Sequence, residues 1–493
     1  MSITPMMQQY LETKKQYKDC IIFYRLGDFY EMFFEDAITA SKELEITLTG
    51  KNCGLEERAP MCGVPYHAVD SYLNKLVTKG YKVAIVEQVE DPATAKGIVK
   101  REVVRIVTPG TNLNTSALDE TKNNYLMSIV CVENCFGIAI VDITTGDFFV
   151  TEVENNRALL DEIYKFMPSE IICNDAFLLT GIDIDDLKNR LNITLFHDDM
   201  CKKALTDHFK VYDLSALGID NYDVGTNAAG ALMQYLTETQ KNSLSHLTQI
   251  IPYSTNKFMI LDTSTRRNLE LCETLREKQK RGSLLWVLDK TKTAMGARML
   301  RSYIEQPLID KESIIKRQKA IEELNKSLIT RDELREYLSP IYDLERLISK
   351  VAYKSANPRD LIALLNSLKM LPHIKTVIQD FKSPLFKEIT EELDVLDDIT
   401  SLIDNSINED PPINIKEGGI IKEGYNEEVD RLRKAKTEGK TWLAELETKE
   451  KEKTGIKGLK IKYNKVFGYY LDVTNSYKDL VPDYYVRKQT LTN

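Results

Sequence analysis

The hydrophobic pattern of the first 113 residues alternates between short apolar runs and amphipathic stretches. The apolar runs predict strands at Ile21–Leu26, Val83–Val89 and Val103–Val107. Positions with a helical period predict helices over Asp36–Leu44 and Asp70–Lys79. Pro60–His67 contains two prolines and a glycine, and predicts a rigid loop before the second helix. A small mixed α/β domain is therefore expected over residues 1–113.

A second alternation of strands and helices follows a polar segment. Asn112–Asn123 has few apolar residues and predicts a linker. Tyr125–Val132 and Gly137–Val150 are rich in Ile and Val and predict strands, with a hairpin turn at Thr144–Asp147. Alternating patterns continue to about Leu247. These features predict a second α/β domain over residues 121–250.

Beyond Leu261 the apolar residues follow the 3.6-residue period of helices. Apolar positions recur at Leu284–Leu288 and at Met299–Ile304, and Pro307 ends one helix. Asn357-Pro358 starts another, because proline is tolerated in a first helical turn. The buried face of that helix is expected to hold Leu361, Leu364, Leu365 and Leu368. A helical core and lever domain is expected over residues 254–437.

One long amphipathic helix is predicted from Gly424 to about Lys453. Its charges complement the helix macrodipole, and Gly455 supplies a C-terminal stop. The acids near its start are Glu427, Glu428 and Asp430, and the lysines near its end are Lys449, Lys451 and Lys453. At ~1.5 Å per residue the helix would span about 40 Å, a suitable length for a lever.

A basic segment follows this helix. Between Glu452 and Asp472 there is no acid, whereas five lysines occur there: Lys453, Lys457, Lys460, Lys462 and Lys465. Apolar and polar residues alternate over 459–464, so Lys460, Lys462 and Asn464 share one face of a predicted hairpin. Such a face suits DNA phosphates, although a solvated strand face is the simpler interpretation of an isolated lysine pair.

Composition describes an ordinary globular protein. The 493 residues are 43% hydrophobic and 29% charged, which predicts three or four domains of roughly 150 residues. The net charge of −9 argues against a nucleic-acid partner, but local clusters decide binding because the Debye length is about 8–10 Å. The sequence has no apolar run of the ~20 residues that a membrane helix needs. Eight cysteines without a CxxC pair indicate reduced thiols in a cytoplasm.

The most unusual stretch is residues 21–36. Six of the twelve residues from Phe23 to Phe34 are aromatic, and a turn at Gly27-Asp28 interrupts them. Phe29 and Glu31 therefore lie at or just past a turn, where a side chain can be presented to a partner. A core hairpin whose aromatic side chains simply pack is the alternative.

GDFYEMF at residues 27–33 resembles the signature of the MutS DNA mismatch-recognition family. Further stretches resemble the same family in its order and spacing: 60–67, 87–97, 100–110, 261–271, 296–307 and 457–473. The resemblance implies a multidomain α/β plus all-α architecture. Its parts would be a small mixed α/β mismatch-binding domain (1–113), a ribonuclease-H-like connector (121–250), a helical core and lever (254–437) and a small β-containing clamp (438–493).

The family implies recognition of mismatched and looped-out base pairs in duplex DNA during post-replicative repair. Phe29 would enter the minor groove as a wedge, and kinking selects a weakly stacked step because that step costs less to deform. Glu31 would hydrogen-bond to the displaced base, and nearby phosphates favour its protonated form. Lys460, Lys462, Asn464 and Lys465 would contact the DNA backbone.

The family also implies ATP and Mg²⁺ in a nucleotide domain, a homodimer and a MutL-type partner. The one tempting P-loop, Gly439-Lys440-Thr441, has Lys434 at its first glycine position and lies inside the predicted long helix. The sequence is therefore expected to be the N-terminal portion of a longer cytoplasmic protein. We expect this portion to have no catalytic residues, no cofactor or metal of its own and no membrane partner.

Two alternatives stay open on the sequence alone. One is a structural paralogue that binds branched DNA without probing mismatches. The other is a nuclease, because Asp142 followed by Thr144, Thr145 and Gly146 is similar to the metal-binding acid of ribonuclease-H-like enzymes. A tight hairpin is the favoured interpretation of those residues.

Overall fold

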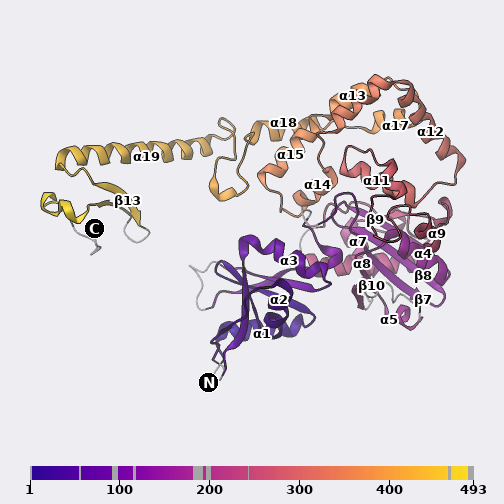
Figure 1. Ribbon diagram of the computed structural model, residues 1–493, viewed down its shortest axis with the longest axis horizontal. Coiled ribbons are helices and arrows are strands. Elements are labelled where there is room, and N and C mark those ends of the chain that lie inside the picture. The colour runs from indigo at the N-terminus through magenta and orange to yellow at the C-terminus, as the bar shows by residue number, and fades with distance from the viewer. Residues whose placement is uncertain are drawn as a thin grey trace. The chain divides into compact units, whose positions relative to one another are not determined.

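The computed structural model describes residues 3–54, 57–90, 98–114, 118–180, 182, 192–195, 201–241, 244–464 and 468–486. It divides into two compact units, Met1–Leu396 and Asp397–Asn493. Figure 1 shows two sheets and a set of helices in the first unit, and a long helix with a hairpin in the second. The multidomain α/β plus all-α prediction is confirmed.

The first sheet has six strands in the order β3-β4-β2-β1-β5-β6. Their bounds are β1 Cys20–Leu26, β2 Phe29–Phe33, β3 Thr49–Lys51, β4 Ala59–Pro65, β5 Lys82–Gln88 and β6 Arg101–Val107. β1 pairs with β5 in parallel, and the other pairings are antiparallel. The predicted mixed sheet is confirmed, and its β1–β2 hairpin places Phe29 at the start of a strand.

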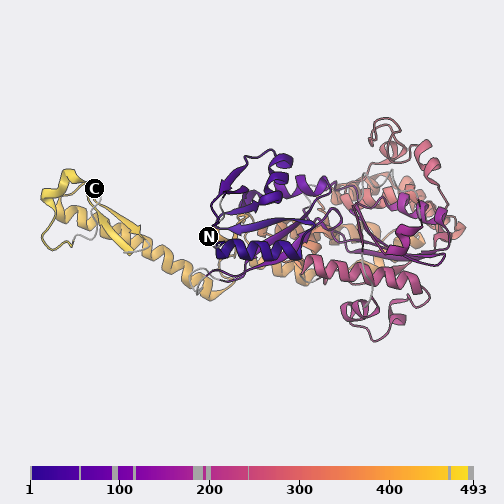
Figure 2. The same ribbon diagram turned by 90° about the horizontal axis from the view of Figure 1, so that it is seen from below.

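Helices cover both faces of this sheet. α1 (Pro5–Gln16) packs on one face, where its Met7 and Tyr10 join Tyr24 and Phe33 in a buried cluster. α2 (Phe34–Leu44) and α3 (Val69–Thr78) pack on the other. Figure 2 shows α1 running below the sheet in the view from below. Because successive strand residues point to opposite faces, the aromatic run is divided between the two clusters.

Residues 60–67 are not a loop, so that prediction is wrong. They form most of β4, which pairs with both β2 and β3, and then a 3₁₀ turn at Tyr66–Ala68. Pro60 and Pro65 lie at the two ends of the strand, where a missing N–H disturbs the sheet least. The two prolines therefore mark the ends of a strand, and the glycine marks a close approach between neighbouring strands.

The second sheet has the order β11-β10-β7-β8-β9-β12. Its bounds are β7 Leu126–Val132, β8 Cys135–Asp142, β9 Asp147–Val153, β10 Glu170–Cys173, β11 Asn192–Leu195 and β12 Ile251–Pro252. β7, β8 and β9 form an antiparallel meander, and β10 and β11 continue in parallel beside β7. This order agrees with the predicted ribonuclease-H-like connector.

Among the described residues, helices pack on both faces of the second sheet. α7 (Cys201–Phe209) and α8 (Asp223–Gln240) pack on one face, and α4 (Asn156–Phe166) and α5 (Asp175–Leu179) on the other. α8 approaches β8 so closely that a Cβ on Gly137 would lie 2.1 Å from the Val224 carbonyl oxygen. Only glycine fits there, since a side chain would displace the helix.

The rest of the first unit is helical, as predicted. The helices are α9 Thr263–Asn268, α10 Leu284–Leu288, α11 Ala294–Glu305, α12 Lys311–Lys326, α13 Leu328–Leu338, α14 Leu344–Ala352, α15 Pro358–Leu368, α16 Leu371–Ile378 and α17 Pro384–Glu392. The predicted start at Asn357-Pro358 is confirmed by a capping box between Asn357 and Asp360. Of the predicted buried face, Leu364, Leu365 and Leu368 are buried and Leu361 is half-buried.

One described helical stretch, Pro358–Ile378, is long and apolar enough by length and composition to cross a membrane. It is divided into α15 and α16 and contains Arg359, Asp360 and two lysines. Its buried leucines pack inside the fold, which is typical of core helices.

The second unit contains α18 (Asp397–Ser406), α19 (Glu427–Thr454) and the hairpin of β13 (Lys460–Asn464) and β14 (Gly468–Asp472). α19 has 28 residues and begins at Glu427, three residues later than predicted, with Asn426 as its N-cap. It ends at Thr454, and its C-cap Gly455 has φ 72°. None of its described residues is buried. The helix runs unbroken through residues 437–438, and the domain boundary there stays a prediction.

Candidate nucleic-acid interface

Phe29 is the exposed member of the aromatic run. Phe29 is the first residue of β2, and its side chain lies on the same sheet face as that of Phe33. Phe33 is covered by α1 and is 1% exposed, whereas Phe29 is 47% exposed. Phe23, Tyr24 and Tyr30 are buried as well. The prediction that Phe29 is presented past a turn therefore agrees with the geometry.

The turn before Phe29 is held from two sides. Gly27 has φ 59°, a conformation that favours glycine, and its carbonyl oxygen accepts a hydrogen bond from Nε of Arg25 at 2.5 Å. The Asp28 carbonyl accepts one from the Tyr66 N–H at 2.9 Å. The guanidinium of Arg25 lies 4.0 Å from the centre of the Tyr66 ring. The exposed phenyl ring thus projects from a fixed backbone.

Glu31 lies on the same face of β2 and is bound to a cation. Its carboxylate forms an ion pair with Nζ of Lys51 on β3 at 2.5 Å, and the two side chains are 18% and 34% exposed. Residue 31 is in the middle of this strand. Lys51 was missed by sequence reasoning, because no spacing rule links residues on β2 and β3.

Gly63 makes room for both side chains. It lies directly opposite Glu31 on β4, and a Cβ there would be 3.6 Å from Cγ of Glu31 and 3.7 Å from Cδ1 of Phe29. The same Cβ would lie only 3.3 Å from the Tyr30 carbonyl oxygen. The glycine of residues 60–67 is therefore explained by the sheet beside the candidate site.

The predicted basic hairpin is confirmed, but an acid joins its lysine face. Lys460 pairs with Asp472 across the two strands, and Nζ of Lys462 forms an ion pair with Asp472 at 2.7 Å. The hydrogen bond to this carboxylate raises the pKa of Lys462 above its usual value. In the sequence, Asp472 only marks the end of the acid-free segment. Pairing the two strands symmetrically about the turn would have placed Asp472 opposite Lys460.

The other predicted hairpin residues differ in position. Lys460 is exposed. Asn464 pairs with Gly468 at the end of the hairpin, and Lys465 lies outside the described residues. The opposite face carries Tyr463 and Tyr469, whose exposed rings have their centres 5.1 Å apart.

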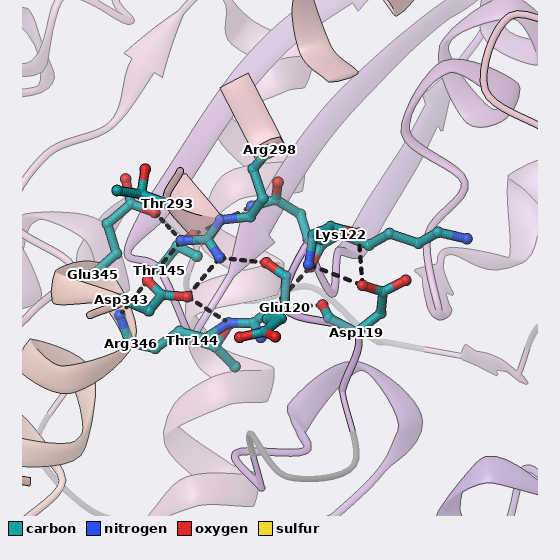
Figure 3. A network of polar contacts seen from close by, with 12 residues as sticks. Asp119, Glu120, Lys122, Thr144, Thr145, Thr293, Arg298, Asp343, Glu345 and Arg346 are labelled. Carbon is teal, nitrogen blue, oxygen red and sulfur yellow. Dashed lines mark hydrogen bonds and ion pairs between the residues drawn. The ribbon is translucent and has the colours of Figure 1, made fainter. Parts of the chain in front are cut away.

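The predicted linker is tied to the helical region by two buried arginines. The Arg298 guanidinium, 5% exposed, bonds to both carboxylate oxygens of Asp343 at 2.6 and 2.8 Å and to the Glu120 carbonyl oxygen at 2.9 Å. Arg346 donates to the carbonyl oxygens of Asp119 and Lys122. Figure 3 shows these two side chains converging on the linker. Sequence reasoning missed them.

Asp142 has a structural role. It is fully buried and accepts hydrogen bonds from the Asn123 amide, the Asn124 N–H and both the N–H and hydroxyl of Thr144. Among the described residues there is no group of three or more His, Cys, Asp or Glu that could hold a metal ion. The tight-hairpin interpretation is confirmed.

Gly439-Lys440-Thr441 lies inside α19, where the Thr441 hydroxyl donates to the Thr437 carbonyl. A phosphate-binding loop follows a strand and leaves its backbone N–H groups free, so this sequence is not a P-loop.

Three family models match the chain in order: MutS domain I over residues 4–116, MutS domain II over 124–248 and MutS domain III over 264–477. Together with the two sheets and the helical region, they define a multidomain protein of the mismatch-repair class. The chain belongs to the MutS family.

Several curated relatives are each called DNA mismatch repair protein MutS. That of Lachnoclostridium phytofermentans is 68% identical across the whole chain, which covers 53% of that protein. Those of Ruminiclostridium cellulolyticum and Acetivibrio thermocellus are 56% and 55% identical, and the chain covers 57% of each. The chain therefore spans about half the length of these relatives.

Proposed function

We propose that this chain recognises mismatched and looped-out base pairs in duplex DNA during post-replicative mismatch repair. The family membership and the names of its relatives support this role. The observation that carries the proposal is the 47% exposure of Phe29 within an otherwise buried aromatic run, because a wedge must reach a groove.

Phe29 enters the minor groove at a poorly stacked step and kinks it. Unstacking costs a few kcal/mol per step, and less at a mismatch, so the kink selects the defect without reading sequence. Glu31 then hydrogen-bonds to the displaced base. Lys460, Lys462, Asn464 and Lys465 contact backbone phosphates through a sequence-independent electrostatic attraction.

The whole protein uses ATP and Mg²⁺, acts as a homodimer in the bacterial cytoplasm at the nucleoid, and recruits a MutL-type partner. These parts of the proposal follow the family resemblance and the relatives that the chain matches.

The test compares binding of the 493-residue chain to matched, mismatched and branched duplexes at one fixed low salt concentration. Phe29→Ala is expected to abolish the preference for the mismatch while leaving matched-DNA affinity within about twofold, since phosphate contacts dominate that affinity. Ile38→Ala is the matched control, because Ile38 is an exposed apolar residue on α2 of the same domain, 43% exposed.

Equal mismatch preference in the unmodified chain and Phe29→Ala would overturn the wedge. A preference for the branched duplex over the mismatched one would favour the paralogue that binds branched DNA.

A further inference from the structure

Lys51 already holds the carboxylate that is proposed to meet the base. β4 lies between β2 and β3, so the Lys51 side chain must cross β4 to reach Glu31. On its way from the row of Ala59 to Glu31, Nζ of Lys51 lies 5.6 Å from the centre of the Phe33 ring. This cross-strand contact is specific to the face that exposes Phe29.

The ion pair limits what Glu31 can do in the DNA-free protein. The carboxylate is mostly covered, and Lys51 compensates its charge at 2.5 Å. Glu31 can hydrogen-bond to a base only when Lys51 releases it. A backbone phosphate is the anion that DNA offers to Lys51 in exchange.

We propose that Lys51 is a specificity-determining residue that passes from Glu31 to a DNA phosphate when Phe29 enters a mismatched step. The inference rests on the proposed function of the Phe29 end. On matched DNA the phenyl ring stays outside the stack, and Glu31 remains paired with Lys51. On mismatched DNA the displaced base takes Glu31, and the freed Lys51 turns to a backbone phosphate.

This exchange makes the effect of Lys51 depend on Glu31. In Lys51→Met the carboxylate has no cation in either complex, so it repels the phosphates of matched DNA. On mismatched DNA the freed carboxylate has a base to bind, and only the phosphate contact is lost. Lys51→Met is therefore expected to weaken matched binding more than mismatched binding, raising the mismatch preference about threefold, the size of a part-exposed ion-pair contribution.

The experiment measures both affinities for the unmodified chain, Lys51→Met, Glu31→Gln and the double variant at one salt concentration. In the Glu31→Gln background, Lys51→Met is expected to weaken both duplexes equally and leave the preference unchanged. Lys79→Met is the control for losing a surface ion pair, because Lys79, the C-cap residue of α3, pairs with Glu43 of α2 at 2.8 Å in the same domain. Thermal unfolding of each variant reports whether the domain is intact.

An equal loss on both duplexes in both backgrounds would make Lys51 a plain phosphate ligand and overturn the exchange. An unchanged or lowered preference in Lys51→Met would overturn it too. The unmodified chain separates this failure from failure of the proposed function: with no mismatch preference there, both fall, whereas with a clear preference only the exchange is wrong.

Discussion

Both the Phe29 end of the first sheet and the hairpin after α19 hold a lysine against a carboxylate, but different side chains surround the two pairs. Glu31 and Lys51 lie beside an exposed phenyl ring on a rigid six-stranded sheet. Asp472 and Lys462 lie on a two-stranded ribbon, with Lys460 exposed on the same face. In the proposed mechanism the acid of the first pair acts on a base, whereas the acid of the second pair reduces the positive charge of the lysine face.

The comparison teaches that a cation near DNA has two possible uses. A lysine that compensates a carboxylate beside a wedge influences discrimination, because its partner can act on a base. A lysine on an exposed ribbon influences affinity alone, because phosphates are the same at every step. The following variants test this division.

Glu31→Gln is expected to give the largest effect after loss of Phe29. The neutral amide keeps or tightens binding to both duplexes, because it repels no phosphate and frees Lys51. Matched binding gains most, so the mismatch preference is expected to fall about tenfold, the equivalent of ~1.4 kcal/mol. Competition between labelled matched and mismatched duplexes measures this ratio. A preference equal to that of the unmodified chain would contradict the assigned role.

Lys460→Gln is expected to act on affinity and not on preference. The lost phosphate contact makes the slope of log affinity against log salt shallower by ~0.9. Titrations at four or more salt concentrations give the slope on each duplex. A changed mismatch preference would show that the hairpin takes part in discrimination and would break the comparison.

Asp472→Asn is expected to give the smallest effect and of opposite sign. Releasing Lys462 from its ion pair strengthens binding to both duplexes about twofold, since exposed pairs contribute only ~0.2–1 kcal/mol. Asp483→Asn serves as the control, because Asp483 is an exposed acid after the hairpin. Weaker binding by Asp472→Asn would mean that the carboxylate is needed to position Lys462.

The strands and helices of this protein could largely be predicted from apolar periodicity. Ile21–Leu26 and the hairpin near Thr144 follow their local patterns because burial on one or both faces dictates them. The loop predicted for residues 60–67 was wrong, because their prolines lie at the ends of a strand that forms by pairing with distant parts of the chain. Pairing across a sheet leaves no mark on local spacing.

The candidate site shows the same division. The exposure of Phe29 follows from the turn at Gly27-Asp28, which is a local signal. Lys51 and Asp472 were missed because they reach the site through strand pairing. Arg298 and Arg346 come from helices more than 170 residues after the linker they hold, which only the folded structure reveals.

The anchoring of the linker joins the N-terminal domain firmly to the rest of its unit. The Asn112 amide donates to Asn74 at one end, and Arg346 donates to the carbonyl oxygen of Asp119 at the other. Glu170 of the second sheet also accepts hydrogen bonds from the Thr108 hydroxyl and the Gly110 N–H. A force applied to the exposed phenyl ring is therefore passed on to the second sheet and to the helices that carry the two arginines.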